Sequence, residues 1–190
     1  TIYTYNLTVF DPTWFWGYSP SEKLRPPGAP PPFAARGKVD RQGLIERLQL
    51  QMAAKDSPKL HTASRGYIEF LQLGGVIKME DLDSALLRKY LKRSVPILTG
   101  LSSTYLYGDP REFGPQGDPD DIRGCATGHF VVLYGYDKEE RTVQVADPWL
   151  PNPLGEQHHY DVELDRLISS ILLGVLTYDA NLLVIEPKRK

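Results

Sequence analysis

The apolar and polar positions from Gly128 to Pro148 predict two strands joined by a charged turn. Apolar side chains recur from Phe130 to Tyr136 and again from Val143 to Ala146. The segment between them, Asp137 to Arg141, consists of charged residues alone. Two apolar runs separated by a short polar segment are typical of a β-hairpin. We expect the rest of the fold to be built around this hairpin.

The same kind of pattern predicts strands and helices on both sides of the hairpin. Further strands are predicted at Thr1 to Phe10, Val76 to Met79, Val95 to Leu101, His158 to Val162 and Asn181 to Ile185. Helices are predicted from Asp40 to about Lys55, from Thr62 or Ala63 to Leu73, from Ser84 to Lys92, and from Asp165 to Gly174. This mixture indicates an α/β or α+β fold. We expect one α+β domain over residues 1–190, with a mainly antiparallel sheet and helices packed on it.

Two segments fall outside these elements. Residues 19–37 are rich in proline, which cannot join a helix or a central strand, and we expect an exposed extended loop there. Gly108 to Gly128 is a loop of about twenty residues, and loops of that length inside a compact domain are usually functional or mobile. An aromatic cluster precedes the proline-rich loop, and we interpret it as a small satellite core: Trp14, Phe15, Trp16 and Tyr18.

Composition excludes several classes of function. A net charge of −2 and an isoelectric point near 6.1 lack the basic character that is typical of nucleic-acid-binding proteins. No apolar run approaches the roughly 20 residues that span a bilayer, and no signal peptide is recognisable, so no membrane insertion is expected. A single cysteine excludes an internal disulfide and suits the cytoplasm. The chain begins with Thr1, which indicates that a Met was removed or that this is a piece of a longer polypeptide.

A candidate catalytic pair lies at the two ends of the hairpin. If its strands pair antiparallel, His129 before the first strand and Asp147 after the second emerge at the same edge of the sheet. A hydrogen bond between them would fix the tautomer of the imidazole and stabilise its protonated form, as the orienting carboxylate of a hydrolase triad does. The alternative is that His129 starts a strand by chance and that Asp147 opens an ordinary turn.

Other chemistries find less support in the sequence. His158 and His159 are adjacent on a predicted strand, so they point to opposite faces and do not suit one metal ion. With one cysteine and no HExxH spacing, we expect neither a metal site nor a cofactor. Thr1 as an N-terminal nucleophile is an option, but the residues around it offer no base.

The segments GHFVVLYGYD and VQVADP resemble the second half of a papain-like cysteine peptidase. The likeness is narrower to the bacteriocin-processing peptidases, which are family thirty-nine of the cysteine peptidases, and to their stand-alone bacterial relatives. It covers about Val95 to Pro148 and implies the C-terminal antiparallel sheet half of the papain-like fold. Carried over to this chain, the resemblance implies that His129 is the general base and that Asp147 orients it.

The chain departs from that family in its cysteine. In the family the nucleophilic cysteine precedes the histidine at the start of a helix, with a glutamine just before it, but no cysteine occurs here before Cys125. The linker from Cys125 to His129 would have to fold back sharply to bring the thiol to the imidazole. No helix pattern follows Cys125, so a plain loop thiol is the simpler interpretation. The oxyanion-binding glutamine cannot be assigned.

Three hypotheses about function remain open. In the first, the chain is the histidine and aspartate half of a cysteine peptidase-like hydrolase, whose nucleophile lies on an upstream segment of the same protein. In the second, the same fold is a catalytically inactive module that binds peptides. In the third, Cys125 is the nucleophile. Each predicts a peptide or protein substrate or ligand, and three aromatic residues are candidates to line its cleft: Tyr105, Tyr107 and Trp149.

Overall fold

The computed structural model describes residues 1–16 and 40–187. These residues form two compact units, one made of residues 1–6 with the chain from Glu80 onward, the other of residues 7–79. No helix within the described ranges has the length and apolar character needed to cross a membrane. The proline-rich segment 19–37 and Tyr18 lie outside the described residues.

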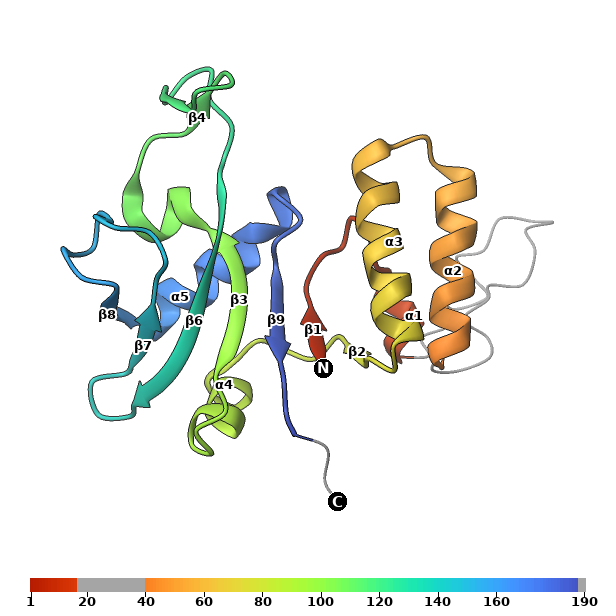
Figure 1. Cartoon of the computed structure of the whole chain (residues 1–190), viewed down its shortest axis with the longest axis horizontal. Coiled ribbons are helices and arrows are strands. Elements are labelled where there is room, and N and C mark those ends of the chain that lie inside the picture. The colour runs from red at the N-terminus through yellow and green to blue at the C-terminus, as the bar shows by residue number, and fades with distance from the viewer. Residues whose placement is uncertain (17–39, 188–190) are drawn as a thin grey trace, which may run out of the picture. The chain divides into compact units, whose positions relative to one another are not determined.

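The larger unit is built on an antiparallel sheet (Figure 1). Its strands lie side by side in the order β1-β9-β3-β6-β7-β8. Their bounds are β1 Ile2–Thr4, β3 Ile97–Ser102, β6 Gly128–Asp137, β7 Thr142–Ala146, β8 His159–Glu163 and β9 Asn181–Val184. The fold is therefore α+β, as the hydrophobic pattern predicts, and the last strand lies inside the sheet between β1 and β3.

The predicted hairpin is confirmed as β6 and β7. Val132 pairs with Ala146 and Leu133 with Val145, which brings the start of β6 level with the end of β7. The charged segment forms the turn. Within it, the carboxylate of Asp137 accepts hydrogen bonds from the backbone N–H groups of Glu139 and Glu140. The hairpin thus delivers both of its ends to one edge of the sheet.

Two helices cover one face of this sheet. They are α4 (Ser84–Leu91), capped by the side chain of Asp83, and α5 (Leu164–Leu173), which lies behind β3 and β6 in Figure 1. Both turn apolar side chains onto the inward side chains of the strands, and the members with no exposed surface include Leu87, Ile97, Leu101, Val131, Leu133, Val145, Leu167 and Ile171. The opposite face of the strands carries the exposed side chains of Leu98, Phe130 and Tyr134.

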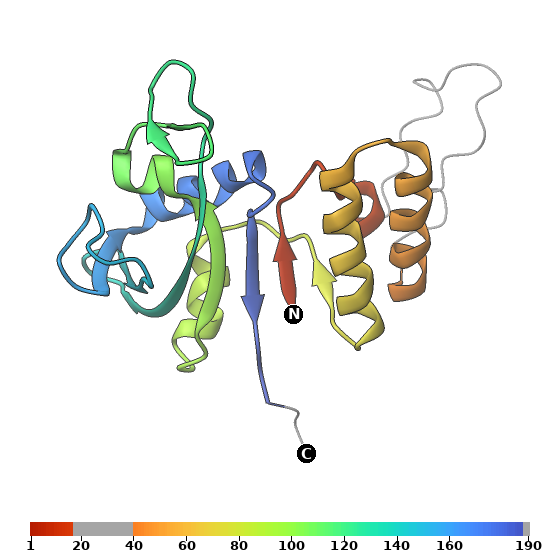
Figure 2. The ribbon, with the colours of Figure 1, turned by 45° about the horizontal axis from the view of Figure 1, so that its top comes forward.

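The chain between β3 and β6 is structured. The continuation of β3 is a single π-helical turn, η3 (Thr104–Gly108), rather than more extended chain. The long loop that follows holds two short paired strands, β4 (Glu112–Phe113) and β5 (Asp118–Pro119), and forms an arm that extends beyond the sheet in Figures 1 and 2. The carboxylate of Asp120 holds the base of this arm by accepting from the backbone of Ile122 and Arg123.

The smaller unit is helical. It contains α1 (Thr13–Trp16), α2 (Arg41–Ala54), α3 (Pro58–Gln72) and the two-residue strand β2 (Ile77–Lys78). The ring of Phe10 contacts the rings of Trp14, Phe15 and Tyr67, with centroids 4.7 to 6.2 Å apart. The aromatic cluster before the proline-rich segment is therefore core, as the sequence predicts for Trp14 and Phe15.

Two predicted boundaries are wrong. The first strand ends at Thr4, because the chain turns after Asn6 and leaves Leu7 63% exposed. Helix α3 begins four residues earlier than predicted, at Pro58. Its start is set by the Ser57 hydroxyl, which accepts from the Leu60 N–H, and by a proline in the first turn, where its missing N–H costs nothing.

We predict that Gly100→Ala destabilises the larger unit by about 1–3 kcal/mol, the usual cost of overpacking. A Cβ at Gly100 would lie 2.3 Å from the backbone oxygen of Asp179, which cannot rotate away. Urea unfolding followed by circular dichroism measures the effect. Gly66→Ala is the control: inside α3 the added Cβ has open space, and we expect about 0.5–1 kcal/mol of stabilisation. Equal responses of the two variants would contradict the packing at Gly100.

Candidate active site

The histidine at the start of β6 meets the aspartate at the end of β7. His129 Nε2 lies 2.8 Å from Oδ1 of Asp147, and the imidazole side chain is 22% exposed. His129 pairs across the ladder with Leu101 of β3, on the face that α5 covers. Alternation along β7 places Asp147 on the same face as Val143 and Val145. The contact predicted from the hairpin pattern is thus present.

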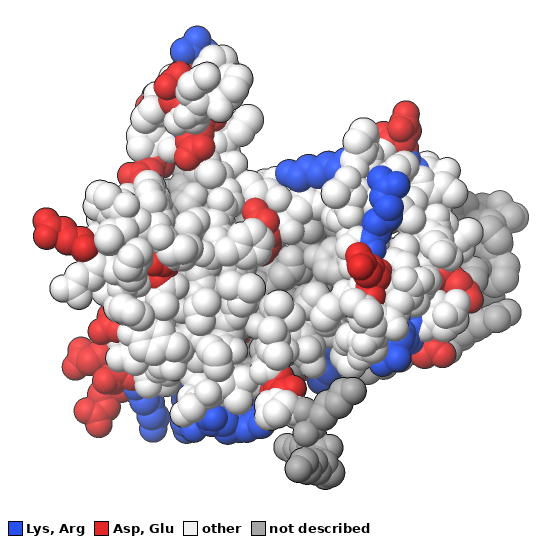
Figure 3. Space-filling view, in the orientation of Figure 1, with Lys and Arg blue, Asp and Glu red and all other residues white. Residues whose placement is uncertain are grey.

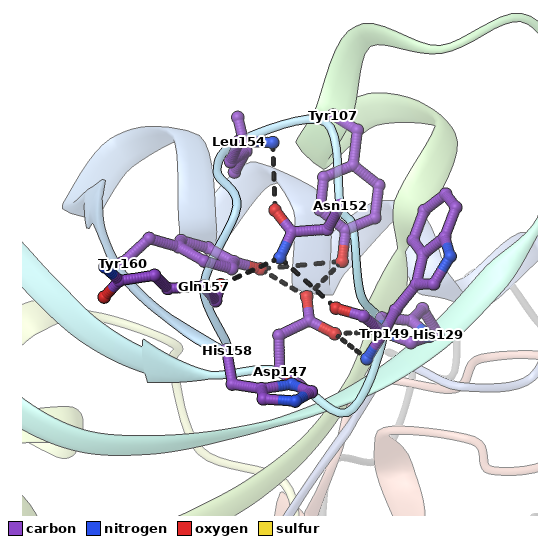
Figure 4. Close-up of polar contacts among 9 residues, drawn as sticks. All are labelled: Tyr107, His129, Asp147, Trp149, Asn152, Leu154, Gln157, His158 and Tyr160. Atoms are coloured by element: carbon purple, nitrogen blue, oxygen red, sulfur yellow. Dashed lines mark hydrogen bonds and ion pairs between the residues drawn. The ribbon is translucent and has the colours of Figure 1, made fainter.

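Asp147 is the most connected residue of the site (Figure 4). Its side chain has no exposed surface. Oδ1 accepts hydrogen bonds from His129 Nε2 and from the backbone N–H of Trp149, both at 2.8 Å. Oδ2 accepts from the hydroxyl of Tyr160 at 2.5 Å and from the hydroxyl of Tyr107. Each carboxylate oxygen therefore has two donors.

These contacts determine the ionisation of the aspartate. Burial by itself raises the pKa of Asp147, because it removes water from the charged form. The hydrogen bonds from Tyr107, Tyr160, His129 and the Trp149 backbone act in the opposite direction, and the net result is a pKa below the ordinary value. A carboxylate buried this completely thus remains charged because its neighbours donate to it.

Burial and the bond to Asp147 raise the pKa of both tyrosines, so their hydroxyls stay protonated and act as donors. The π-helical turn η3 carries Tyr107. Its carbonyls accept from α5: Arg166 Nε donates to the Leu106 oxygen at 2.8 Å, and Nη2 donates to the Tyr105 oxygen at 2.9 Å. Helix α5 therefore fixes the turn that aims Tyr107 at the carboxylate.

The three aromatic residues expected to line a cleft have different surroundings. Tyr107 is 8% exposed and belongs to the inner hydrogen-bond network. The ring of Trp149 is 44% exposed and lies 6.1 Å from the imidazole of His129 and 5.3 Å from the ring of Tyr107. Tyr105 points outward, 43% exposed, under the guanidinium of Arg166. Trp149 is thus the aromatic side chain that both borders the imidazole and meets solvent.

Cys125 lies at the base of the arm and is exposed. Its backbone exchanges two hydrogen bonds with Glu112, at 2.8 and 3.1 Å, which hold this part of the chain against the arm. Among the described residues no hydrogen bond joins its thiol to His129. The structure therefore brings His129, Asp147, Tyr107 and Trp149 together and leaves Cys125 outside that group.

An open apolar groove of about 530 Å³ lies on the other face of the sheet, the face that α4 and α5 leave uncovered. It is lined by Leu98, Phe130, Val131, Val132, Ala146, Asp147, Pro148, His158 and His159. In Figure 3 the surface over the strands carries few charged side chains, and most of the Lys, Arg, Asp and Glu side chains lie around it. The groove thus offers apolar contact area on the face of the sheet opposite to the His129 side chain, which is not one of its lining residues.

The sequence did not reveal two residues of this site. Tyr160 donates to Oδ2 of Asp147, and His158 Nδ1 donates to its backbone oxygen at 2.7 Å. Tyr160 pairs with Val145 of β7 and therefore lies on the same face of the sheet as Asp147. The sequence predicts the strand of Tyr160 but not this register, so it could not place Tyr160 at the site. Within residues 1–16 and 40–187, no three His, Cys, Asp or Glu side chains gather as a metal site.

A known protein family matches the part of the chain that holds this site. The model of the family described as Peptidase_C39 like family matches residues 51–167, which is more than half of the chain. The matched range includes the whole of α3, the strands β3 to β8, and both His129 and Asp147. The curated proteins and the solved structures gave no match.

We predict that Asp147→Asn lowers the free energy of unfolding by about 1–3 kcal/mol at pH 6, because two tyrosine donors lose a charged acceptor. The pKa of Asp147 is depressed in the folded state, so its contribution is present above the unfolded pKa of about 3.9 and is lost as pH falls through the folded pKa. The difference between wild type and variant should shrink below about pH 4.

Urea unfolding from pH 6 to pH 3 measures this difference. Asp165→Asn is the matched control, since Asp165 is 66% exposed in its ion pair with Arg141. We expect that variant to stay within about 1 kcal/mol of wild type. A difference for Asp147→Asn that does not depend on pH would contradict the depressed pKa.

Proposed function

The chain belongs to the Peptidase_C39 like family, and from that premise we propose that its larger unit is the histidine and aspartate half of a cysteine peptidase-like hydrolase. His129 is the general base and Asp147 orients it. The observation that carries the proposal is the 2.8 Å bond between Nε2 of His129 and Oδ1 of a carboxylate that has no exposed surface. The antiparallel sheet then corresponds to the C-terminal half of a papain-like fold.

The geometry of His129 suits proton transfer at its other nitrogen. Nε2 donates to Asp147, so in the neutral ring Nδ1 is the atom with a lone pair. Among the described residues Nδ1 of His129 has no hydrogen-bond partner. In a cysteine hydrolase Nδ1 takes the proton of the thiol, and the thiolate that results attacks the peptide carbonyl. The imidazolium then gives the proton to the leaving amine as the C–N bond breaks. Asp147 stabilises the imidazolium that forms between these steps.

The nucleophilic thiol is expected from a segment outside residues 1–190. Cys125 is exposed, and its backbone is tied to Glu112 of the arm by two hydrogen bonds. It also lacks a helix that would begin at the thiol and lower its pKa, since the chain continues into the extended strand β6. These two features favour an external thiol over Cys125.

We expect the substrate to be a peptide that contacts Trp149, because this side chain is 44% exposed and its ring lies 6.1 Å from the imidazole of His129. The same surface would serve a module that binds peptides without cleaving them. The two functions differ in one respect: only the hydrolase needs a thiol whose reactivity depends on His129.

We predict that iodoacetamide, applied at pH 5 to 6 to the full-length gene product, labels one cysteine rapidly and that this cysteine is not Cys125. At this pH a free thiol of pKa about 8.5 reacts slowly, whereas a thiolate paired with an imidazolium reacts fast. His129→Ala should slow the labelling of that cysteine at least tenfold, and should lower kcat/KM for peptide hydrolysis by about 10²–10⁴. Mass spectrometry identifies the labelled residue.

Cys125→Ser is the matched control and should leave both rates unchanged. Fast labelling of Cys125 that depends on His129 would make Cys125 the nucleophile. If every cysteine reacts as an ordinary thiol and His129→Ala changes nothing, the hydrolase is wrong and the peptide-binding module remains.

A further inference from the structure

We propose that Tyr107 and Tyr160 are positioning residues: their two hydroxyls hold Oδ2 of Asp147 so that Oδ1 stays directed at His129. The inference rests on the proposed function for its catalytic meaning. Its structural part concerns the hydrogen bonds of one carboxylate, and these can be tested in the chain alone. The ring of Tyr107 lies 6.1 Å from the imidazole of His129, but both hydroxyls bond to Oδ2 of Asp147, so the hydroxyls act through Asp147.

The geometry separates the two edges of the carboxylate. Oδ1 faces His129 Nε2 and the Trp149 N–H, while Oδ2 faces the two hydroxyls, which lie 3.5 Å from each other (Figure 4). A carboxylate held at both oxygens cannot rotate about its last torsion without losing bonds on both sides. Without the hydroxyls, only the Oδ1 contacts would resist that rotation. The two oxygens of a carboxylate are equivalent, so what the tyrosines fix is the plane of the group, in the orientation that points one oxygen at His129.

Each hydroxyl comes from an element that is itself held in place. Tyr107 lies on the π-helical turn, whose carbonyls accept from Arg166 of α5. Tyr160 lies on β8, which pairs with β7 through the Tyr160 and Val145 register. The two donors reach Asp147 from positions 40 residues before it and 13 residues after it. Two independent elements thus converge on one oxygen atom.

The hydroxyls also keep the aspartate charged. Burial favours the neutral acid. Of the hydrogen bonds that oppose this effect, those from Tyr107 and Tyr160 are the strongest. The other groups that face Asp147 are the imidazole of His129, the backbone N–H of Trp149 and, at its backbone oxygen, His158. Removal of the tyrosine hydroxyls leaves burial less opposed, so the pKa of Asp147 should rise.

The test follows the carboxyl carbon of Asp147 by ¹³C NMR during acid titration of the chain. In wild type we expect this carbon to keep its carboxylate shift to lower pH than in Tyr107→Phe or Tyr160→Phe. The titration midpoint should move to higher pH in each single variant and further in the double variant. Phenylalanine retains the ring in both positions, so the loss is confined to the hydroxyl.

Tyr90→Phe is the matched control. Its hydroxyl is also buried and also bonds to a second tyrosine, Tyr3 at 2.7 Å, but it does not reach Asp147. We expect Tyr90→Phe to leave the Asp147 titration unchanged. If the double variant does not fold, the two single variants decide. An Asp147 midpoint that stays at its wild-type pH in folded Tyr107→Phe and Tyr160→Phe would overturn the proposal.

The outcome is independent of peptide hydrolysis. A chain that lacks a reactive thiol can still show the shift of the Asp147 titration, in which case the positioning role stands and the hydrolase fails. Conversely, a hydrolase that depends on His129 but shows no shift retains its function without this role for the tyrosines. A variant that merely loses packing changes its thermal unfolding but not the ionisation of Asp147.

Discussion

Asp147 accepts four hydrogen bonds although its side chain has no exposed surface, and the donors come from separate elements of the larger unit. A buried carboxylate without such donors would take up a proton. The four donors therefore have to be in place together: His129 at the start of β6, the backbone after β7, Tyr160 on β8, and Tyr107 on the π-helical turn that α5 holds. Because all four donors must reach the Asp147 carboxylate, the register of β6, β7 and β8 and the packing of α5 depend on one another.

The hairpin of β6 and β7 brings the two residues of the candidate pair together. Because its turn is short, residues 18 positions apart in the chain, His129 and Asp147, meet at one edge of the sheet. The ring of Trp149 lies at the same edge, 6.1 Å from the imidazole, and the residue is 44% exposed. The imidazole and an exposed aromatic side chain thus lie together, while the apolar groove lies on the opposite face of the sheet. The match to the Peptidase_C39 like family covers this region, in keeping with the proposed role of His129.

The sequence could predict those parts of the fold that depend on local pattern. The hairpin, the helix α2 with its Asp40 cap, the helix α4 and the His129 to Asp147 contact follow from alternation, capping residues and a charged turn. For α4 the sequence allows either Asp81 or Asp83 as the cap, and the structure has Asp83. The partners of Oδ2 could not be predicted, because Tyr107 lies 40 residues away and reaches the carboxylate only through a π-helical turn, which has no reliable sequence signal. The position of Cys125 depends equally on the β4 and β5 arm, whose strands are two residues each and too short to leave a pattern.

The central claim is that Asp147 holds His129 with its proton on Nε2 and leaves Nδ1 to receive one. ¹⁵N NMR of the imidazole, recorded at a pH at which the ring is neutral, tests this most directly. The account predicts a protonated Nε2 and a bare Nδ1 in wild type, and a mixture of the two tautomers in Asp147→Asn. A proton found on Nδ1 in the wild-type chain would contradict it, because the nitrogen needed to take the proton of a thiol would already be occupied.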